Sequence, residues 1–466
     1  MDPLIWIVLP HQLFKPSVLL KKATTVYIVE DPYYLNPSFH VQKLCLHVAS
    51  MHYYYEMIQK KYPNLKVQYI PFSSCSYASF RSMKNVHMYH PIDYKSMQHW
   101  KGKNITFHET PAFITPYNMC MKYKSQYGKN KRYTHLHFYK WQRKRLNLFI
   151  DTKENPWFGE WSFDKENRNP FGSNYQEPKY SSFMNDYIKK AILYVEKNFP
   201  KAFGDISTST FYYPVTHLQA KRQLTSFLKN KLDQFGPSQD AIASNVVFGH
   251  HSILSSSINI GLLTPNDVIT SVQNVCNGSK INKTIFASIE GFVRQIIGWR
   301  EYMRFIYMFH HEELQHAFEH DIFSNTLPSS WFKGTTSLAI LNTCIQKVKK
   351  YAYLHHIERL MVINNIATLC EVQPKEMYRW FMVCFIDSYD WVMLPNVRMN
   401  YNALDTDIRF MSRVYLSSEN YIRKMSNFRN KEDDEQLHVL YSRFLRKYKY
   451  ILKKDYIMAA QLKKIA

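Results

Sequence analysis

Residues 25–70, TVYIVEDPYYLNPSFHVQKLCLHVASMHYYYEMIQKKYPNLKVQYI, contain two β-rich runs separated by one long helical pattern. Residues 25–29 are rich in β-branched residues and predict a strand. In residues 41–61 apolar side chains recur every three or four positions, which predicts a helix, and residues 67–70 return to a strand pattern. Strand, helix and strand with short connections are typical of a parallel sheet that is covered by helices.

The flanking sequence divides the chain into an α/β part and a helical part. Residues 5–9 form another apolar run, which we interpret as a buried strand because it lacks the basic region and cleavage site of a signal peptide. We therefore expect residues 1–120 to form an α/β domain with a parallel sheet. Beyond about residue 180 the strand signal disappears, so we expect residues 181–466 to form an all-helical domain, reached through a basic linker at residues 121–180. Helical periodicity marks residues 184–198, 216–233, 284–310, 337–368 and 375–393.

The charge of the chain favours a polyanionic partner. Its 466 residues include 60 Lys and Arg against 37 Asp and Glu, a formal net charge of +23. This favours nucleic acid first and an acidic membrane surface second, although no apolar run is long enough to span a membrane. Residues 122–145 combine basic and aromatic side chains without Asp or Glu, which suits phosphate contacts and base stacking. A solvated basic helix between domains explains the same stretch equally well.

The cysteine and histidine spacing argues against a metal site. The seven cysteines are scattered without a CxxC pair, which favours a reducing compartment over a disulfide framework. Residues 316–320 match the H-x-x-E-H spacing of some zinc peptidases, but they end a polar helix. We interpret them as a solvated helix end and predict no metal site.

Residues 352–362, AYLHHIERLMV, place two imidazoles, a carboxylate and a guanidinium in an otherwise apolar helical pattern. Buried charges need partners, so such a helix is either partly exposed or part of a site. Other segments favour a site: the serine-rich residues 251–263 suit a diphosphate, and residues 294–302 add Gln, Trp and Arg. Residues 378–397 then add a carboxylate among oxidisable aromatic side chains.

These motifs, together with residues 138–143, 161–168 and 417–426, resemble motifs of the photolyase/cryptochrome superfamily. They occur along this chain in the same order as in that superfamily. The resemblance is to the iron–sulfur photolyases related to bacterial (6-4) photolyases. It implies a Rossmann-like antenna domain at the N-terminus and an all-α FAD-binding domain at the C-terminus. It also implies an ion pair between Arg359 and Asp387 beside the flavin, in accord with the need of a buried arginine for a carboxylate. The FAD-binding residues that it implies are Ser252, Ser255, Gln295, Arg300, Arg359, Asp387 and Met393.

The resemblance further implies light-driven repair of UV-damaged DNA by reduced FAD, with the damaged pyrimidines flipped toward the flavin. His355 and His356 favour the (6-4) photoproduct over the cyclobutane dimer, because only the former needs a proton transfer. Trp380 and Tyr389 would relay electrons to the flavin, unless they are ordinary aromatic core. The residues expected to contact DNA are Arg143, Lys144, Arg145, Arg168, Trp299 and Tyr415.

The departures from the family leave a second function open. Where the family has four cluster-binding cysteines, this chain has Ile340, Arg429, Glu432 and Glu435, so we predict no iron–sulfur cluster. The glycine-rich stretch expected after Asn396 is also altered, through residues 404–407. A cryptochrome-like blue-light photoreceptor or a non-catalytic DNA-binding flavoprotein is therefore the alternative. We expect a monomer inside a cell, not secreted, with a viral or nuclear location open; a ribityl-lumazine antenna chromophore is the family expectation.

Overall fold

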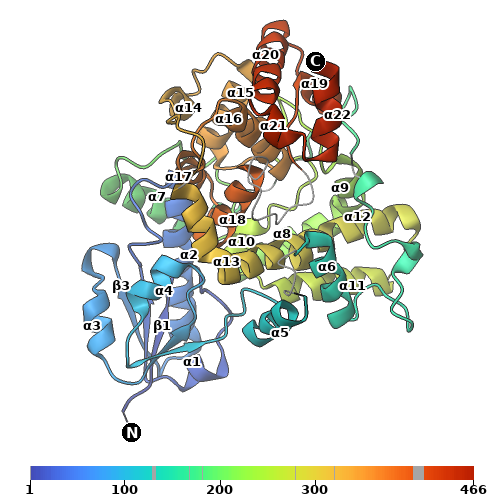
Figure 1. The fold of residues 1–466 in the computed structure, drawn as a ribbon. Coiled ribbons are helices and arrows are strands. Elements are labelled where there is room, and N and C mark those ends of the chain that lie inside the picture. Colours follow the sequence, from blue (N-terminus) through green and yellow to red (C-terminus); the bar gives the residue numbers. More distant parts are fainter. Residues whose placement is uncertain are drawn as a thin grey trace.

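The computed structural model describes residues 2–127, 133–166, 168–180, 182–278, 280–319, 321–401 and 414–465. Its N-terminal part contains a five-stranded sheet in the order β3-β2-β1-β4-β5, in which all neighbouring strands are parallel (Figure 1). The expected fold class, a parallel α/β part followed by helices, is confirmed. The strands are β1 (Ile5–Val8), β2 (Thr25–Val29), β3 (Lys66–Ile70), β4 (Val86–Tyr89) and β5 (Ile105–His108).

The central helix of the α/β part is α2 (Val41–Lys61), which has the bounds that the periodicity predicts. It begins at His40, whose Nδ1 accepts the backbone N–H of Gln42, and it packs against β3 and against α7 (Asp186–Asn198). Strands β4 and β5 were not predicted from the sequence. Each has four residues with two partly exposed side chains, too short a run for a clear pattern.

Helices form most of the rest of the chain, and in Figure 1 they lie above and to the right of the sheet. A single hydrophobic cluster runs through both parts, from Trp6 in β1 to Met458 near the C-terminus. The domain boundaries at residues 120 and 180 stay predictions. The remaining α-helices are α1 (Val18–Lys22), α3 (Tyr77–Ser82), α4 (Tyr94–Trp100), α5 (Tyr117–Tyr127), α6 (His135–Arg145), α8 (His217–Asn230), α9 (Leu232–Ser238), α10 (Ser255–Asn259), α11 (Pro265–Gly278), α12 (Lys283–Val293), α13 (Glu301–Glu319), α14 (Ser330–Lys333), α15 (Ala339–Tyr351), α16 (Asn365–Leu369), α17 (Pro374–Cys384), α18 (Asp390–Tyr401), α19 (Glu419–Met425), α20 (Lys431–Lys447), α21 (Lys449–Leu452) and α22 (Tyr456–Ile465).

Two predicted helices are interrupted in the structure. The pattern at 337–368 breaks after α15, where Ala352 has a φ of 52°, and the chain turns helical again only at His356. His355 therefore precedes the helix and does not lie within it, as the sequence had suggested. The pattern at 375–393 breaks between α17 and α18, and Asp387 lies in this break. Buried apolar residues continue through both breaks, so the periodicity does not reveal them.

The described part of the chain contains two π-helical segments near the site, η5 and η6. Segment η5 (Arg294–Arg300) connects α12 to α13, and η6 (Glu358–Asn364) precedes α16. A π-helix widens the backbone locally and is frequent at functional sites. Both segments carry side chains that the sequence assigns to the site.

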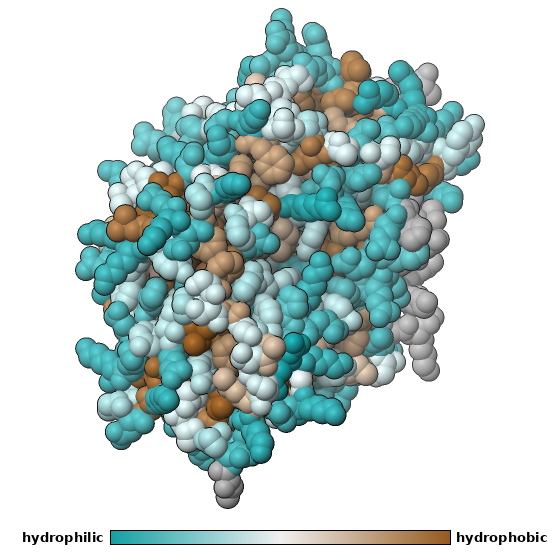
Figure 2. Space-filling model, turned by 90° about the vertical axis from the view of Figure 1, so that its left-hand side faces the viewer, coloured by the Kyte–Doolittle hydropathy of each residue, from teal (hydrophilic) through white to brown (hydrophobic). Residues whose placement is uncertain are grey.

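The surface view in Figure 2 shows hydrophilic side chains over most of one face, with smaller hydrophobic patches between them. Among the helices that the structure describes, no one is both long and apolar enough to cross a membrane.

Candidate functional site

A bidentate ion pair between Arg359 and Asp387 forms the centre of the site. Nη1 of Arg359 lies 2.9 Å from Oδ1 of Asp387, and Nη2 lies 3.3 Å from Oδ2. The hydroxyl of Ser255 donates to Oδ2 at 2.7 Å. Burial acts to raise the pKa of Asp387, but the charge of Arg359 and the two side-chain donors outweigh it, so the pKa is lowered and the carboxylate is ionised. The ion pair implied by the resemblance is present; its contact with a flavin stays a prediction.

A second group of polar side chains lies next to this pair. Asn259 donates from Nδ2 to the backbone oxygen of Asp387 at 3.0 Å, and its Oδ1 accepts from Arg300. The Arg300 guanidinium lies against the rings of Phe113 and Trp391, at 4.9 and 4.7 Å from their centres. Its burial lowers the pKa of Arg300 to about 10.

Several buried polar atoms in this region have no partner within the described structure. They are the hydroxyls of Ser256 and Ser257 in α10 and Nε of Arg300. Buried polar groups are normally hydrogen-bonded, so unpaired donors of this kind fit a bound anionic group such as a diphosphate. Of the other residues expected at FAD, Ser252 and Gln295 are half-buried and Met393 is buried; their contact with the cofactor stays a prediction.

Three imidazoles come together beside the ion pair. The rings of His251 and His355 are nearly parallel, with centres 5.0 Å apart, and the ring of His356 lies 5.7 Å from that of His251. His355 is buried, whereas 45% of the His356 side chain is exposed. His251 was missed as a site residue, because no spacing in the sequence relates residue 251 to residue 355.

The buried imidazoles are held in the neutral form. Burial lowers the pKa of His355 well below its usual range, and the neighbouring His251 and His356 lower it further. Burial and His356 do the same to His251. Ring nitrogens of the three side chains lie within 4.8 Å of one another, a grouping that could hold a metal ion. The absence of a metal stays a prediction.

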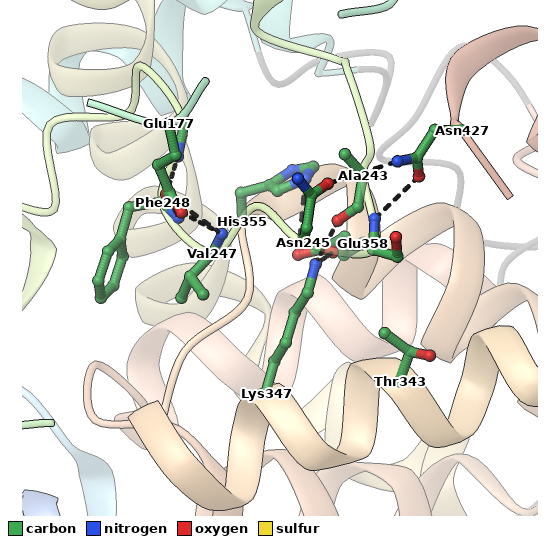
Figure 3. Close-up of polar contacts among 12 residues, drawn as sticks. Glu177, Ala243, Asn245, Val247, Phe248, Thr343, Lys347, His355, Glu358 and Asn427 are labelled. Carbon is green, nitrogen blue, oxygen red and sulfur yellow. Dashed lines mark hydrogen bonds and ion pairs between the residues drawn. The ribbon is translucent and has the colours of Figure 1, made fainter. Parts of the chain in front are cut away.

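A buried ion pair lies behind His355 (Figure 3). Oε2 of Glu358 is 3.5 Å from Nε2 of His355, and Oε1 of Glu358 accepts from Nζ of Lys347 at 2.6 Å. Lys347 also donates to the backbone oxygen of Ala243 at 2.7 Å. Burial raises the pKa of Glu358, and the nearby Lys347 opposes that rise. Neither Lys347 nor Glu358 was predicted at the site.

The loop that leads to His251 is fixed by side chains from distant parts of the chain. Glu177 accepts the backbone N–H groups of Val247, Phe248 and Gly249, as Figure 3 shows in part. Asn427 accepts the N–H of Ser244 at 2.9 Å and lies beside Asn245. These contacts fix the backbone of the loop that leads to His251.

Comparisons with known proteins identify relatives of this chain. Residues 6–211 match the family model of deoxyribodipyrimidine photo-lyase-related proteins. A (6-4) photolyase of Agrobacterium fabrum is 36% identical over 303 residues, which cover 64% of this chain and 57% of that protein. By sequence, the chain is therefore similar to photolyase-related proteins.

Further relatives match a smaller share of the chain or are less identical. An uncharacterized protein of Acanthamoeba polyphaga mimivirus is 39% identical over 69 residues, 15% of this chain and 55% of that protein. The chain thus spans little more than half the length of these two curated relatives. Among solved structures, a class III photolyase from Agrobacterium tumefaciens has a TM-score of 0.58 at 15% identity, covering 100% of this chain and 98% of that one. A Synechocystis cryptochrome has a TM-score of 0.58 at 11% identity, covering 98% and 88%. These two likenesses show the photolyase/cryptochrome fold.

The residues that the sequence assigned to DNA contact divide into exposed and buried ones. Arg168 is exposed and pairs with Asp164 at 2.5 Å and with Asp240 at 4.0 Å, and Asp240 lies 3.5 Å from His356. Arg168 therefore lies at the outer edge of the imidazole group. Lys144 is exposed and pairs with Glu154.

The structure contradicts the expectation for Arg143. This side chain is fully buried, and its guanidinium donates to the backbone oxygens of Leu148, Phe149 and Trp161. It shapes the turn after α6 and is not available to a phosphate. Arg145 is half-buried and donates to the Gln142 side chain and to the Ile114 oxygen. Trp299, which donates to Asn396, and Tyr415 are half-buried, and their contact with DNA stays a prediction.

Aromatic side chains extend from the ion pair in two directions. The Arg359 guanidinium lies 4.0 Å from the centre of the Phe385 ring, which contacts Trp380, and Trp380 donates to the oxygen of Trp331. On the other side the Tyr389 hydroxyl lies 2.7 Å from Nε2 of His47. Trp331 and His47 were not singled out in the sequence, since each lies in an ordinary helical pattern.

The region that corresponds to the iron–sulfur cysteines of the family contains a cavity of about 410 Å³. Ile340 is buried at the start of α15, where Asp433 accepts the N–H groups of Ala339 and Ile340 at 2.8 Å each. Whether the protein lacks a cluster stays a prediction. His320, the last residue of the H-x-x-E-H match at residues 316–320, lies outside the described residues. The altered stretch at residues 404–407 also lies outside them. The cavity is lined by Trp331, Thr336, Ser337, Leu338, Leu341, Ile366, Cys370, Glu435, Gln436, Val439 and Leu440.

Proposed function

We propose that this protein is a FAD-dependent photolyase that uses light to repair UV-damaged DNA, with the (6-4) photoproduct favoured over the cyclobutane dimer. The observation that carries the proposal is the group of three imidazoles, His251, His355 and His356, next to the Arg359–Asp387 pair. The 36% identity to a (6-4) photolyase supports the same reaction. The fold alone does not distinguish repair from light sensing, because a cryptochrome is equally similar.

The residues that would hold FAD are the hydroxyls of α10, Arg300 and the Arg359–Asp387 pair. Bound FAD would supply the absorption of blue light and the transfer of an electron. Asp387 stays ionised because Arg359 and Ser255 stabilise its charge. An ionised carboxylate at this place accepts a hydrogen bond from any N–H group of a cofactor beside it. Arg359 in turn is kept in position by the Leu354 oxygen, to which its Nε donates at 2.8 Å.

The two adjacent histidines have different surroundings and would have different roles. His356 is the exposed member, oriented by Asp240, so it is placed to exchange a proton with a flipped lesion. His355 lies behind it, buried and neutral, between His251 and Glu358. Migration of the hydroxyl in a (6-4) photoproduct needs such a proton transfer, whereas splitting of a cyclobutane dimer does not.

DNA would approach over the exposed basic side chains near the imidazole group. Arg168, one of the predicted DNA contacts, pairs with Asp240, which also lies 3.5 Å from His356. The net charge of +23 supports binding to a polyanion. Damaged bases flip out at low energetic cost because their pairing is already weakened.

A repair assay tests the proposal. The photoreduced protein is illuminated with oligonucleotides that carry a single (6-4) photoproduct or a single cyclobutane dimer, and the loss of each lesion is followed by chromatography. We expect loss of the (6-4) photoproduct in light and none in the dark. His356→Ala should abolish that repair while lesion binding persists, and His438→Ala, a half-exposed histidine far along the chain in α20, is the matched control. Flavin-loaded protein that repairs neither lesion would instead favour the cryptochrome-like function.

A further inference from the structure

A tyrosine and a histidine from different parts of the fold form a buried hydrogen bond. Tyr389, the residue before α18, is 2% exposed, and His47 in α2 is fully buried. The Tyr389 hydroxyl lies 2.7 Å from Nε2 of His47, and Nδ1 of His47 lies 3.1 Å from the backbone oxygen of Tyr34. A carbonyl oxygen only accepts, so the proton of the neutral ring is on Nδ1. Nε2 is therefore unprotonated and accepts the hydrogen bond of the Tyr389 hydroxyl.

Both side chains are electrically neutral in this environment. Burial, together with the charge of Lys43, lowers the pKa of His47 to about 3. Burial raises the pKa of Tyr389 well above its usual range, and Asp93 and Asp387 raise it further. Loss of an electron from Tyr389 alone would leave a buried cation, which is costly. The unprotonated Nε2 provides a base at hydrogen-bonding distance for the phenolic proton.

The pair lies next to the candidate cofactor site. Tyr389 follows Asp387 by two residues, and the charges of Asp387 and Arg300 both act on it. Lys43 donates to the backbone oxygen of Ser388 between them, and its Nζ lies 5.2 Å from the centre of the Tyr389 ring. Lys43 thus contacts both the backbone before Tyr389 and the Tyr389 ring, which helps to maintain the distance between the phenol and the imidazole.

We propose that His47 accepts the phenolic proton of Tyr389 when this tyrosine gives up an electron. The family resemblance implies the electron relay through Tyr389, and the proton transfer to His47 is the new inference. The inference rests on the proposed function, because the oxidant is a photoexcited oxidised flavin. Tyr389 gives one electron to that flavin, its O–H bond breaks, and an N–H bond forms at Nε2 of His47. The products on the chain are a neutral tyrosyl radical and an imidazolium, whose Nδ1–H still donates to Tyr34. Return of the electron to Tyr389 returns the proton from Nε2. His47 is a positioning residue, since it acts through Tyr389.

The first test reads the protonation of His47 without using the flavin reaction. Nitrogen NMR of protein labelled in its histidines should show a protonated Nδ1 and a hydrogen-bonded, unprotonated Nε2 for His47. Tyr389→Phe should shift the Nε2 signal and leave Nδ1 unchanged. Tyr54→Phe is the matched control, because Tyr54 is a buried tyrosine of the same helix that bonds to the Phe14 oxygen instead. A proton on Nε2, or no response to Tyr389→Phe, would overturn the proposal.

The second test follows the radical after a light flash on flavin-loaded protein. His47→Gln retains an acceptor of similar reach that cannot take up a proton, so formation of the tyrosyl radical should slow by about tenfold or more. The unmodified protein should also form the radical more slowly in D₂O, and the variant should lose this isotope effect. His40→Gln, at a buried histidine bonded to the Val348 and Lys349 oxygens, is the control.

The outcomes separate this inference from the proposed function. Flavin that binds and bleaches in light, with radical formation equal in His47→Gln and in the unmodified protein, would overturn the role of His47 alone. Bleached protein that forms no tyrosyl radical would overturn the inference for both Tyr389 and His47. Protein that binds no flavin would instead contradict the proposed function, and the NMR test would still report on the Tyr389–His47 bond.

Discussion

Glu358 places a buried carboxylate 3.5 Å from Nε2 of His355 while it pairs with Lys347 at 2.6 Å. The charge behind His355 is thus balanced by a side chain inside the protein. Two buried charges of this kind stabilise a fold only as a pair, because each alone would remain desolvated. The geometry couples the stability of the helical part to the position of an imidazole in the candidate site.

Glu358→Gln should therefore destabilise the protein by about 3–5 kcal/mol, because it leaves Lys347 buried without a counter-charge. Chemical unfolding gives the free energy of unfolding. Glu432→Gln, at an exposed position of α20, is the control and should change that free energy by less than about 0.5 kcal/mol. The double variant Lys347→Met, Glu358→Gln should recover much of the loss. If Glu358→Gln is as stable as the unmodified protein, the Lys347–Glu358 pair does not stabilise the fold.

Asp387→Asn should reduce the amount of FAD that co-purifies with the protein, measured as the ratio of flavin to protein absorbance. The substitution leaves the Arg359 guanidinium without its bidentate partner, and truncating one member of such a pair costs about 2–5 kcal/mol. Ser255→Ala removes only the hydroxyl that donates to Asp387, so it should cost about 1 kcal/mol and retain most of the flavin. Equal flavin content in the two variants would contradict this ranking.

The buried histidines should make the protein unstable in mild acid. Burial lowers the pKa of His11, His47 and His135 to about 3, and those of His251 and His355 are lowered well below their usual range. The unfolded chain, with histidine pKa values near about 6.5, then binds more protons than the folded protein below that pH. Stability is therefore fully present above about pH 6.5 and falls as the pH drops toward 4, by up to about 1.4 kcal/mol per pH unit for each histidine.

Urea unfolding at several pH values measures this slope. A free energy of unfolding that stays constant between about pH 6.5 and 4 would show that these imidazoles become protonated in the folded state.

The sequence predicts well those features that depend on local pattern. Helix α2 and strands β1 to β3 lie where the apolar and β-rich runs of the sequence predict them. The Arg359–Asp387 pair came from the family resemblance and not from periodicity. Arg359 follows the break after α15, and Asp387 lies in the break between α17 and α18. The periodicity instead predicted unbroken helices at 337–368 and 375–393. The first break contains His355 and the second contains Asp387, and the backbone in each departs from the helix that the periodicity predicts.

Contacts between distant segments were beyond the sequence. His251 joins His355 because Glu177 fixes the loop at residues 247–249, and no spacing along the chain encodes that contact. Arg143 was misjudged for the opposite reason. It lies in a strongly basic stretch, yet it donates to two backbone oxygens in the turn after α6 and to a third at Trp161. Composition reports the charge of a segment but not which of its side chains are used internally.

Arg168 and Arg143 should respond differently to substitution, and this comparison tests the DNA-binding surface. Arg168→Ala should weaken binding to any duplex and reduce the slope of log K against log salt by about 0.9, the contribution of one phosphate contact. Arg143→Ala should leave that slope unchanged, because its guanidinium is buried. It should instead lower the free energy of unfolding by about 1–3 kcal/mol, since buried carbonyl oxygens lose their donors. Fluorescence anisotropy with labelled DNA at several salt concentrations, together with chemical unfolding, separates the two effects. A reduced salt slope in Arg143→Ala with unchanged stability would mean that the side chain turns outward to meet DNA.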